Sequence, residues 1–149
     1  MEEKVILLVE DDADVEALTL RALAKFNTAD HVVVARDGPE ALDYLFGTGV
    51  YAGRDATVLP RVVLLDLDLP KMDGFEVLRR IRFDARTKML PIVVLTSSDD
   101  PKDIASCYDL GANSYVRKPV DFAELVETMR QLALYWLVVN KPPAKGVKS

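Results

Sequence analysis

Five short apolar runs alternate with longer segments of helical periodicity along this chain, and this alternation limits the possible folds more than any other feature. The runs are rich in Val, Ile and Leu, which indicates strands that are buried on both faces. The expected strands span 5–9, 31–35, 62–65, 91–96 and 113–117, and the expected helices 12–26, 37–46, 74–86, 101–110 and 121–139. Strands that alternate with helices form parallel sheets. We therefore predict an α/β protein with a doubly wound five-stranded parallel sheet in strand order 2-1-3-4-5.

The length of 149 residues indicates one domain with a single core. We assign residues 1–140 to this domain and expect the basic, proline-containing segment 141–149 to be disordered. Residues 47–60 contain three glycines and predict a loop, which is long for a connection between a helix and a strand.

Charge and composition exclude several classes of function. The net charge is −5 and the basic residues are scattered, so nucleic acid is not expected as a direct ligand. No segment is apolar over the length needed to cross a bilayer, and the N-terminus lacks the pattern of a signal peptide, so no membrane association is expected. The single cysteine, Cys107, cannot form an internal disulfide, which favours a cytoplasmic location.

Polar residues follow four of the five expected strands. Glu10 and Asp11 follow the first strand, Asp66 the third and Lys118 the fifth, while Thr96 ends the fourth. The carboxyl ends of parallel strands meet at one edge of the sheet, where such folds bind ligands. Clustered acids repel one another unless a cation lies among them, and carboxylate oxygens suit Mg²⁺. A lysine and a hydroxyl beside them suit a transferred phosphoryl group, so we expect Asp66 to be a nucleophile that forms an aspartyl phosphate.

These residues resemble the receiver domain of two-component response regulators over almost the whole chain. The resemblance implies a flavodoxin-like fold and a signalling protein that is not an enzyme, apart from catalysing its own phosphorylation and dephosphorylation. It implies that Asp66 accepts a phosphoryl group from a sensor histidine kinase with Mg²⁺ as cofactor. By matching motifs, it assigns the metal to Glu10, Asp11, Asp66 and the backbone carbonyl of Asp68, the phosphate to Thr96 and Lys118, and the conformational switch to Thr96 and Tyr115.

Within this family, the sequence most resembles the single-domain regulators that pair with phytochrome-type histidine kinases. The long loop at 47–60, the sequence DLDLPKMDG at 66–74 and the final segment LALYWLVVNKPP carry this resemblance. It implies that the partner kinase is a phytochrome-type light sensor.

The segment at 132–139 is apolar around its whole circumference, more than a helix packed on one side of a sheet requires. Either this segment folds back onto the core or it meets a second chain, and we favour a homodimer through the end of the last helix together with the fourth helix and the fifth strand. Tyr135, Trp136 and Val139 are the expected interface residues.

Three alternatives compete with the receiver prediction. Asp66 and Asp68, with a later hydroxyl and lysine, also resemble the haloacid-dehalogenase phosphatases, but Pro70 and an acidic pair on the first strand oppose this. A receiver-like binding module that works without phosphorylation is the second, and the complete set of acids, hydroxyl and lysine opposes it. The third is a nucleotide hydrolase, and it is opposed because the sequence has no glycine-rich phosphate loop followed by a lysine.

Overall fold

The computed structural model describes residues 4–24 and 31–143, and it confirms the predicted fold. The five strands form one parallel sheet in the order β2-β1-β3-β4-β5. The elements, in chain order, are β1 (Ile6–Val9), α1 (Ala13–Ala24), β2 (Val32–Ala35), α2 (Gly38–Phe46), η2 (Gly49–Tyr51), β3 (Val62–Leu65), α3 (Gly74–Phe83), β4 (Ile92–Thr96), α4 (Pro101–Asp109), β5 (Ser114–Arg117), α5 (Phe122–Leu134) and η3 (Tyr135–Val139).

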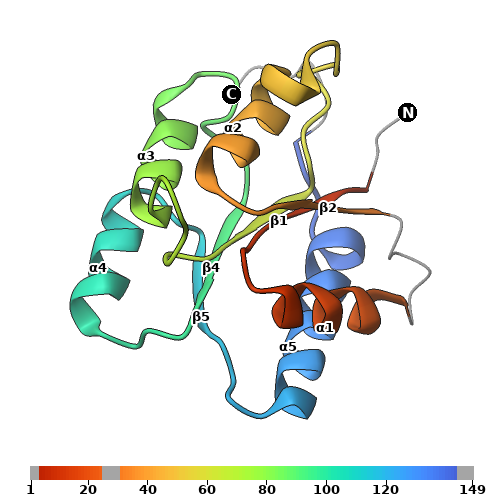
Figure 1. The fold of residues 1–149 in the computed structure, drawn as a ribbon, viewed down its shortest axis with the longest axis vertical. Coiled ribbons are helices and arrows are strands. Elements are labelled where there is room, and N and C mark those ends of the chain that lie inside the picture. Colours follow the sequence, from red (N-terminus) through yellow and green to blue (C-terminus); the bar gives the residue numbers. More distant parts are fainter. Residues whose placement is uncertain (1–3, 25–30, 144–149) are drawn as a thin grey trace.

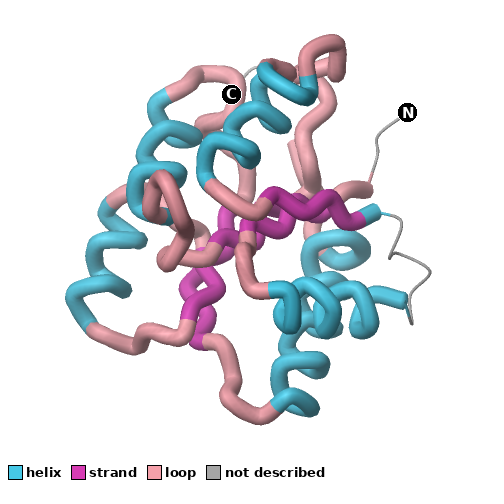
Figure 2. Tube along the Cα trace, viewed as in Figure 1, coloured by secondary structure: helices cyan, strands magenta, loops and turns pink. Residues whose placement is uncertain are grey.

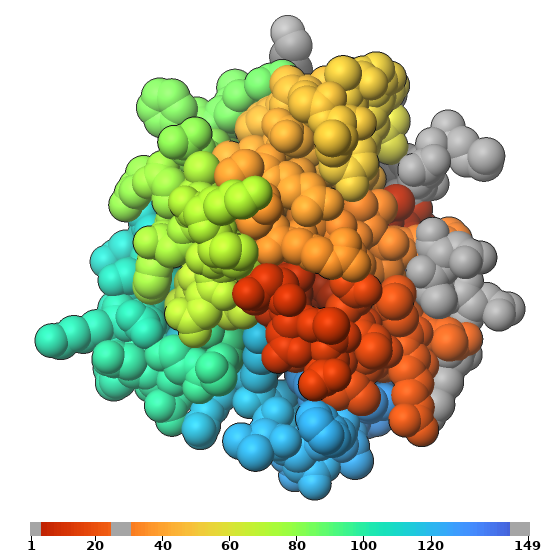
Figure 3. Space-filling view, viewed as in Figure 1, coloured from red at the N-terminus to blue at the C-terminus, as the bar shows by residue number. Residues whose placement is uncertain are grey.

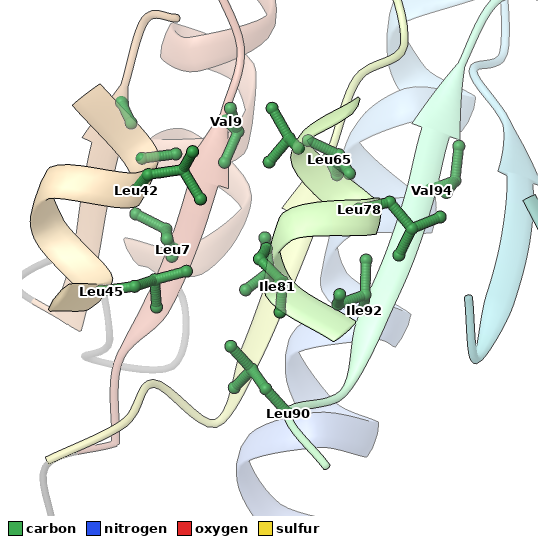
Figure 4. Close-up of a cluster of buried hydrophobic side chains, with 14 of the residues drawn as sticks. Leu7, Val9, Leu42, Leu45, Leu65, Leu78, Ile81, Leu90, Ile92 and Val94 are labelled. Atoms are coloured by element: carbon green, nitrogen blue, oxygen red, sulfur yellow. The ribbon is translucent and has the colours of Figure 1, made fainter. Parts of the chain in front are cut away.

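The sheet is the central layer of three. Helices α1 and α5 cover one face, and α2, α3 and α4 cover the other (Figure 1, Figure 2). Alternate residues of each central strand enter opposite cores, so Leu7 and Val9 pack under α2 and α3 while Ile6 and Leu8 pack against α1 and α5. Figure 4 shows the first of these cores, where side chains of β1, β3 and β4 meet those of α2 and α3. Burial on both faces explains why these strands are apolar throughout.

An aspartate side chain caps the start of each of the five α-helices, with Asp12 in this position at α1. The side chains of Asp37, Asp73 and Asp121 each accept a hydrogen bond from the backbone N–H three residues further on. Asp100 accepts from Lys102 N–H at the start of α4. Such caps satisfy N–H groups that the first turn of a helix leaves without partners. The sequence signals for these helix starts were therefore reliable.

The ends of the helices differ in part from the prediction. Helix α3 ends at Phe83 rather than at residue 86, because Asp84 has an extended backbone and its carboxylate accepts the Arg86 N–H. The last helix changes at Tyr135 from α-helical to π-helical geometry, which continues to Val139. The last two residues of the helix expected at 12–26 lie outside the described residues.

The segment 47–60 is folded and not an open loop. It contains the 3₁₀ turn η2, and the guanidinium of Arg54 donates to the carbonyl oxygens of Tyr44 and Val58. The same guanidinium lies 3.9 Å from the centre of the Tyr44 ring, which Tyr51 meets edge to face. These contacts fix the segment against α2.

The end of the predicted domain at residue 140 stays a prediction. Residues 141–143 form no helix or strand, and the remainder of the expected tail lies outside the described residues. Within the described parts of the chain, no helix has the length and apolar character needed to cross a membrane.

Candidate functional site

The register of the sheet brings the predicted polar residues to one edge. Val9 of β1 pairs with Leu65 of β3, so Glu10 and Asp66 follow side by side. The Asp66 N–H still donates to the carbonyl oxygen of Val9, at 3.1 Å. On the other side the Lys118 N–H donates to the carbonyl oxygen of Thr96, at 2.7 Å. The segments that follow β1, β3 and β5 meet on the face of the molecule shown in Figure 3.

Lys118 joins the two buried acids. Its ammonium group donates to Glu10 Oε1 and, at 3.1 Å, to Asp66 Oδ2. Glu10 is 2% exposed and Asp66 6% exposed, so both carboxyl groups are almost removed from water. Charges at this depth are tolerated only when they are paired. The lysine is therefore held at the acids by the charge that the fold has buried.

Burial and the neighbouring Asp66 carboxyl raise the pKa of Glu10 to about 8, against the lowering effect of Lys118. Burial acts against the charged form of Lys118, but its hydrogen bond to Glu10 and the charge of Asp66 outweigh this and raise the pKa of the lysine. Lys118 is thus a cation at neutral pH, and it lies against both buried carboxyl groups.

The acids fit a divalent cation. Glu10, Asp11 and Asp66 can each offer a carboxylate oxygen, with these oxygens within 4.8 Å of one another. Glu10 Oε2 is buried and has no hydrogen-bond partner among the described residues. A buried acceptor without a partner is costly, and a hard cation would supply one. Asp68 has an exposed side chain, and its backbone N–H donates weakly to Asp66 Oδ1 at 3.3 Å. Its carbonyl stays a predicted ligand.

Thr96 provides the second group without a partner. Its side chain is completely buried at the end of β4, and Oγ1 makes no hydrogen bond within the described residues. Buried hydroxyls in folded proteins are nearly always hydrogen-bonded. The part of the chain that the structure describes has just two such buried side-chain atoms, and both belong to this predicted site. The site is therefore incomplete in a way that a metal ion and a phosphoryl oxygen would remedy.

Tyr115 lies on β5 with its ring packed against the core that α2, α3 and α4 cover. Its hydroxyl donates to the carbonyl oxygen of Ser98, two residues after Thr96, at 2.8 Å. The Ser98 hydroxyl in turn donates to Asp103 Oδ2 at 2.7 Å. The sequence analysis did not identify Ser98 and Asp103 as functional, because no motif or helical spacing relates a loop serine to an acid five residues later.

Gly74 is a further residue that the sequence analysis did not assign to the site. A Cβ atom at this position would lie 2.4 Å from the carbonyl oxygen of Asp66 and 2.7 Å from the Cα of Leu67. Helix α3 therefore begins in direct contact with the backbone that carries Asp66, and a side chain would push them apart. The Asp73-Gly74 pair was a visible signal of a turn, but the close approach was not.

The predicted dimer residues lie at the far edge of the sheet from the site. Tyr135 and Val139 are exposed, as are Leu134 and Val138. Trp136 is half-buried, packs against the core under α1 and α5, and meets the Tyr135 ring edge to face, and its place at an interface stays a prediction. Leu137 is buried. One side of this segment is thus used by the fold, because the helix end still covers the sheet.

Comparison with known proteins gives consistent matches. A family model described as the response regulator receiver domain matches residues 6–130. The probable methanogenesis regulatory protein FilR2 of Methanothrix harundinacea is 41% identical over 139 residues, 93% of this chain and 87% of that protein. Response regulator Rcp1 of Synechocystis is 36% identical over 142 residues, 95% and 94% of the two chains.

Solved structures agree with these matches. The phosphorylated cyanobacterial phytochrome response regulator RcpA superposes with a TM-score of 0.88 at 39% identity, covering 95% of this chain and 99% of that one. The Mn²⁺-bound form of Rcp1 superposes with a TM-score of 0.84 at 35% identity, with the same coverage. These matches do not favour the haloacid-dehalogenase alternative.

Proposed function

This chain belongs to the response regulator receiver family, and we propose that Asp66 is the residue that accepts its phosphoryl group. Receivers are signalling proteins that accept a phosphoryl group from sensor histidine kinases. They are not classical enzymes. The observation that carries the proposal is the pairing of buried Asp66 with Lys118 next to two buried groups, Glu10 Oε2 and Thr96 Oγ1, that lack hydrogen-bond partners.

In the proposed transfer, a carboxylate oxygen of Asp66 attacks the phosphorus of a phosphohistidine on the kinase. A P–O bond forms, the P–N bond breaks, and the imidazole nitrogen leaves with the electron pair. Lys118 balances charge on the phosphoryl oxygens, and the Thr96 hydroxyl donates a hydrogen bond to one of them. Lys118 already donates to Asp66, and Thr96 ends the neighbouring strand β4.

Receiver domains bind a divalent metal ion, and we propose Mg²⁺ for this one. Glu10, Asp11, Asp66 and the backbone carbonyl of Asp68 would hold it. When bound, the ion neutralises negative charge shared between the carboxylates and the phosphoryl group. The donor set of oxygen atoms supports Mg²⁺, and the Mn²⁺-bound form of Rcp1 shows that a related chain takes a divalent ion.

We propose that Thr96 and Tyr115 convert phosphorylation into a surface change. Formation of a hydrogen bond from Thr96 to the phosphoryl group would move the backbone that follows β4. Tyr115 is tied to that backbone through Ser98, so the change reaches the surface formed by α4, β5 and α5.

We further propose a phytochrome-type sensor kinase as the partner. Support comes from RcpA, a phytochrome response regulator that resembles this chain over 95% of its length. The test is phosphotransfer from purified kinases of phytochrome and non-phytochrome type to this protein. Faster transfer from the phytochrome type supports the pairing, and equal or slower transfer contradicts it.

A homodimer through α4, β5 and α5 is also proposed, with Tyr135, Trp136 and Val139 at the interface. The exposed apolar side chains at 134–139 support it. Sedimentation of Tyr135→Asp beside Val50→Asp, which changes an exposed apolar residue on η2, tests it. We expect dissociation in the first variant only; a monomeric parent protein would contradict the proposal.

The test of the phosphoacceptor is incubation with acetyl phosphate, with and without Mg²⁺, followed by intact mass. We expect the mass to increase by one phosphoryl group. This increase should require Mg²⁺ and should be absent in Asp66→Asn. The matched control is Asp109→Asn, which removes an exposed carboxylate on α4 and should keep the gain. Continuous release of phosphate without an adduct would instead support a phosphatase, and no reaction would support a binding module.

A further inference from the structure

Helix α4 is attached to the domain by unusually little apolar burial. Its only buried residue is Cys107, whereas the neighbouring α3 buries Gly74, Val77, Leu78 and Ile81. Burial of apolar surface is the main force that fixes a helix to a sheet. The position of α4 must therefore depend to a larger extent on the hydrogen bonds at its two ends.

At the C-terminal end, α4 is tied to α3. The guanidinium of Arg82 donates to the carbonyl oxygen of Gly111 at 2.8 Å and to Asn113 Oδ1 at 2.8 Å. This tie lies at the edge of the sheet opposite the phosphoacceptor, because it joins the end of α3 to the start of β5. The acceptors of this tie, Gly111 and Asn113, lie in the connection between α4 and β5, away from Asp66 and Thr96.

At the N-terminal end, the tie is Ser98. Its hydroxyl donates to Asp103 Oδ2 on the first turn of α4 at 2.7 Å and accepts the Asp100 N–H at 3.2 Å. Its carbonyl oxygen accepts the Tyr115 hydroxyl at 2.8 Å. Through three hydrogen bonds, Ser98 thus connects the first turn of α4, the N-cap residue Asp100 and strand β5.

A second link crosses the same loop but is weaker. Asp99 and Arg117 form an ion pair at 3.2 Å, with side chains 69% and 58% exposed. Exposed ion pairs contribute little because water screens them. The contacts of Ser98 to Asp103 and Tyr115 are partly shielded from solvent, so we expect each to hold this loop more firmly than the exposed ion pair does.

Ser98 is also close in the chain to the group that would respond to phosphorylation. It follows Thr96 by two residues, and the Thr96 hydroxyl is buried without a partner. A backbone segment this short cannot absorb a movement of Thr96 without moving Ser98. The displacement would pass through the Ser98 hydroxyl to Asp103 and so to α4.

We propose that Ser98 is a positioning residue of the switch, and that its hydrogen bond to Asp103 transmits the movement of Thr96 to helix α4. This inference rests on the proposed phosphorylation of Asp66 and adds the residue pair that couples it to the α4 surface. Breaking the pair should leave phosphorylation intact and disconnect α4 from it.

The experiment is hydrogen exchange of the α4 amides, at residues 102–110, before and after treatment with acetyl phosphate and Mg²⁺, with intact mass recorded on the same samples. In the parent protein we expect phosphorylation to change α4 exchange. In Ser98→Ala we expect exchange about fivefold faster before treatment, as loss of one hydrogen bond implies, and little further change after it.

The matched controls separate coupling from simple loss of structure. Ser97→Ala removes the adjacent exposed hydroxyl, and Ser98→Thr keeps a hydroxyl, so both should retain the response of the parent protein. Asp103→Ala removes the acceptor from the other side and should behave as Ser98→Ala does. It also provides the test if Ser98→Ala does not fold.

A normal α4 response in Ser98→Ala and Asp103→Ala, with the same phosphoryl adduct as the parent protein, would overturn the role of Ser98 and leave the proposed function standing. Absence of the adduct from the parent protein would overturn both. Loss of the response in Ser97→Ala as well would show a general effect of the loop and would also overturn the specific role of Ser98.

Discussion

Helices α3 and α4 lie next to each other on the same face of the sheet (Figure 1) and begin with the same device, an aspartate cap. They are nearly equal in length, with ten and nine residues. Yet α3 is fixed by a row of buried residues in the core shown in Figure 4, and α4 by one buried cysteine and by polar ties at its ends. Two helices that begin with the same local signal therefore differ in what fixes them, which is apolar burial for α3 and mainly hydrogen bonds near its ends for α4.

The largest expected effect comes from the buried face of α3. Ile81→Ala should reduce the free energy of unfolding by about 2–5 kcal/mol, because Ile81 is fully buried and truncation leaves a cavity. Tyr108→Ala on α4, where the side chain is half-exposed, should change it by about 0.5 kcal/mol or less. Urea denaturation measures both. Similar losses for the two variants would refute the contrast between the helices.

The next effect concerns the tie between the helices. Arg82→Ala removes the donors to Gly111 and Asn113, so we expect a loss of about 1–3 kcal/mol in the free energy of unfolding. The control is Arg79→Ala, which removes an exposed ion pair with Glu76 on the same helix and should cost about 0.5 kcal/mol. Equal costs would mean that the tie does not hold α4.

Cys107 reports on how tightly α4 is closed. Burial, with the charge of Asp103, raises the pKa of its thiol from 9.0 to about 11. The thiolate is the reactive form, so alkylation by iodoacetamide at pH 8 should be about a hundredfold slower than in the urea-unfolded chain, and slower still because the side chain is buried.

The pH dependence of Cys107 follows from the direction of the shift. The unfolded chain loses its thiol proton near pH 9 and the folded chain near pH 11, so this group stabilises the fold below pH 9 and the contribution disappears as pH rises to 11. Alkylation of the folded protein should still be rising where that of the unfolded chain has levelled. A shared pH profile would show that α4 opens freely.

The smallest effects should come from the caps. Asp73→Ala and Asp100→Ala each remove one hydrogen bond to a helix N–H and should cost about 1 kcal/mol. For α3 we expect this cost in global unfolding, whereas for α4 it should appear as faster hydrogen exchange of that helix alone. Global destabilisation of equal size in both variants would contradict the mobility of α4.

The sequence by itself determined the fold class, the strand order, the helix starts and the residues at the strand ends. These depend on local signals, namely buried apolar runs, aspartate caps and polar residues at the point where each strand ends. The order of the strands followed from the handedness of the connections only together with the resemblance to receiver domains. The sequence predicted that Asp66, Lys118 and Thr96 lie close together, because the carboxyl ends of parallel strands meet at one edge of the sheet.

Only the tertiary structure decided how these residues meet. The hydrogen bonds of Lys118 to Glu10 and Asp66, and the missing partners of Glu10 Oε2 and Thr96 Oγ1, depend on the register and burial of several strands. The half-burial of Trp136 likewise follows from where the last helix meets the sheet, which apolar character alone does not specify.

The contrast between α3 and α4 was also beyond the sequence. Both segments contain apolar residues at helical spacing, but Val77, Leu78 and Ile81 face two central strands, while α4 lies over the edge of the sheet at β4 and β5. A helix at an edge has less surface to bury against, so its hydrogen bonds decide its position. That physical difference, set by the place of α4 at the edge of the sheet together with its few large apolar side chains, is what makes Ser98 a candidate for the coupling.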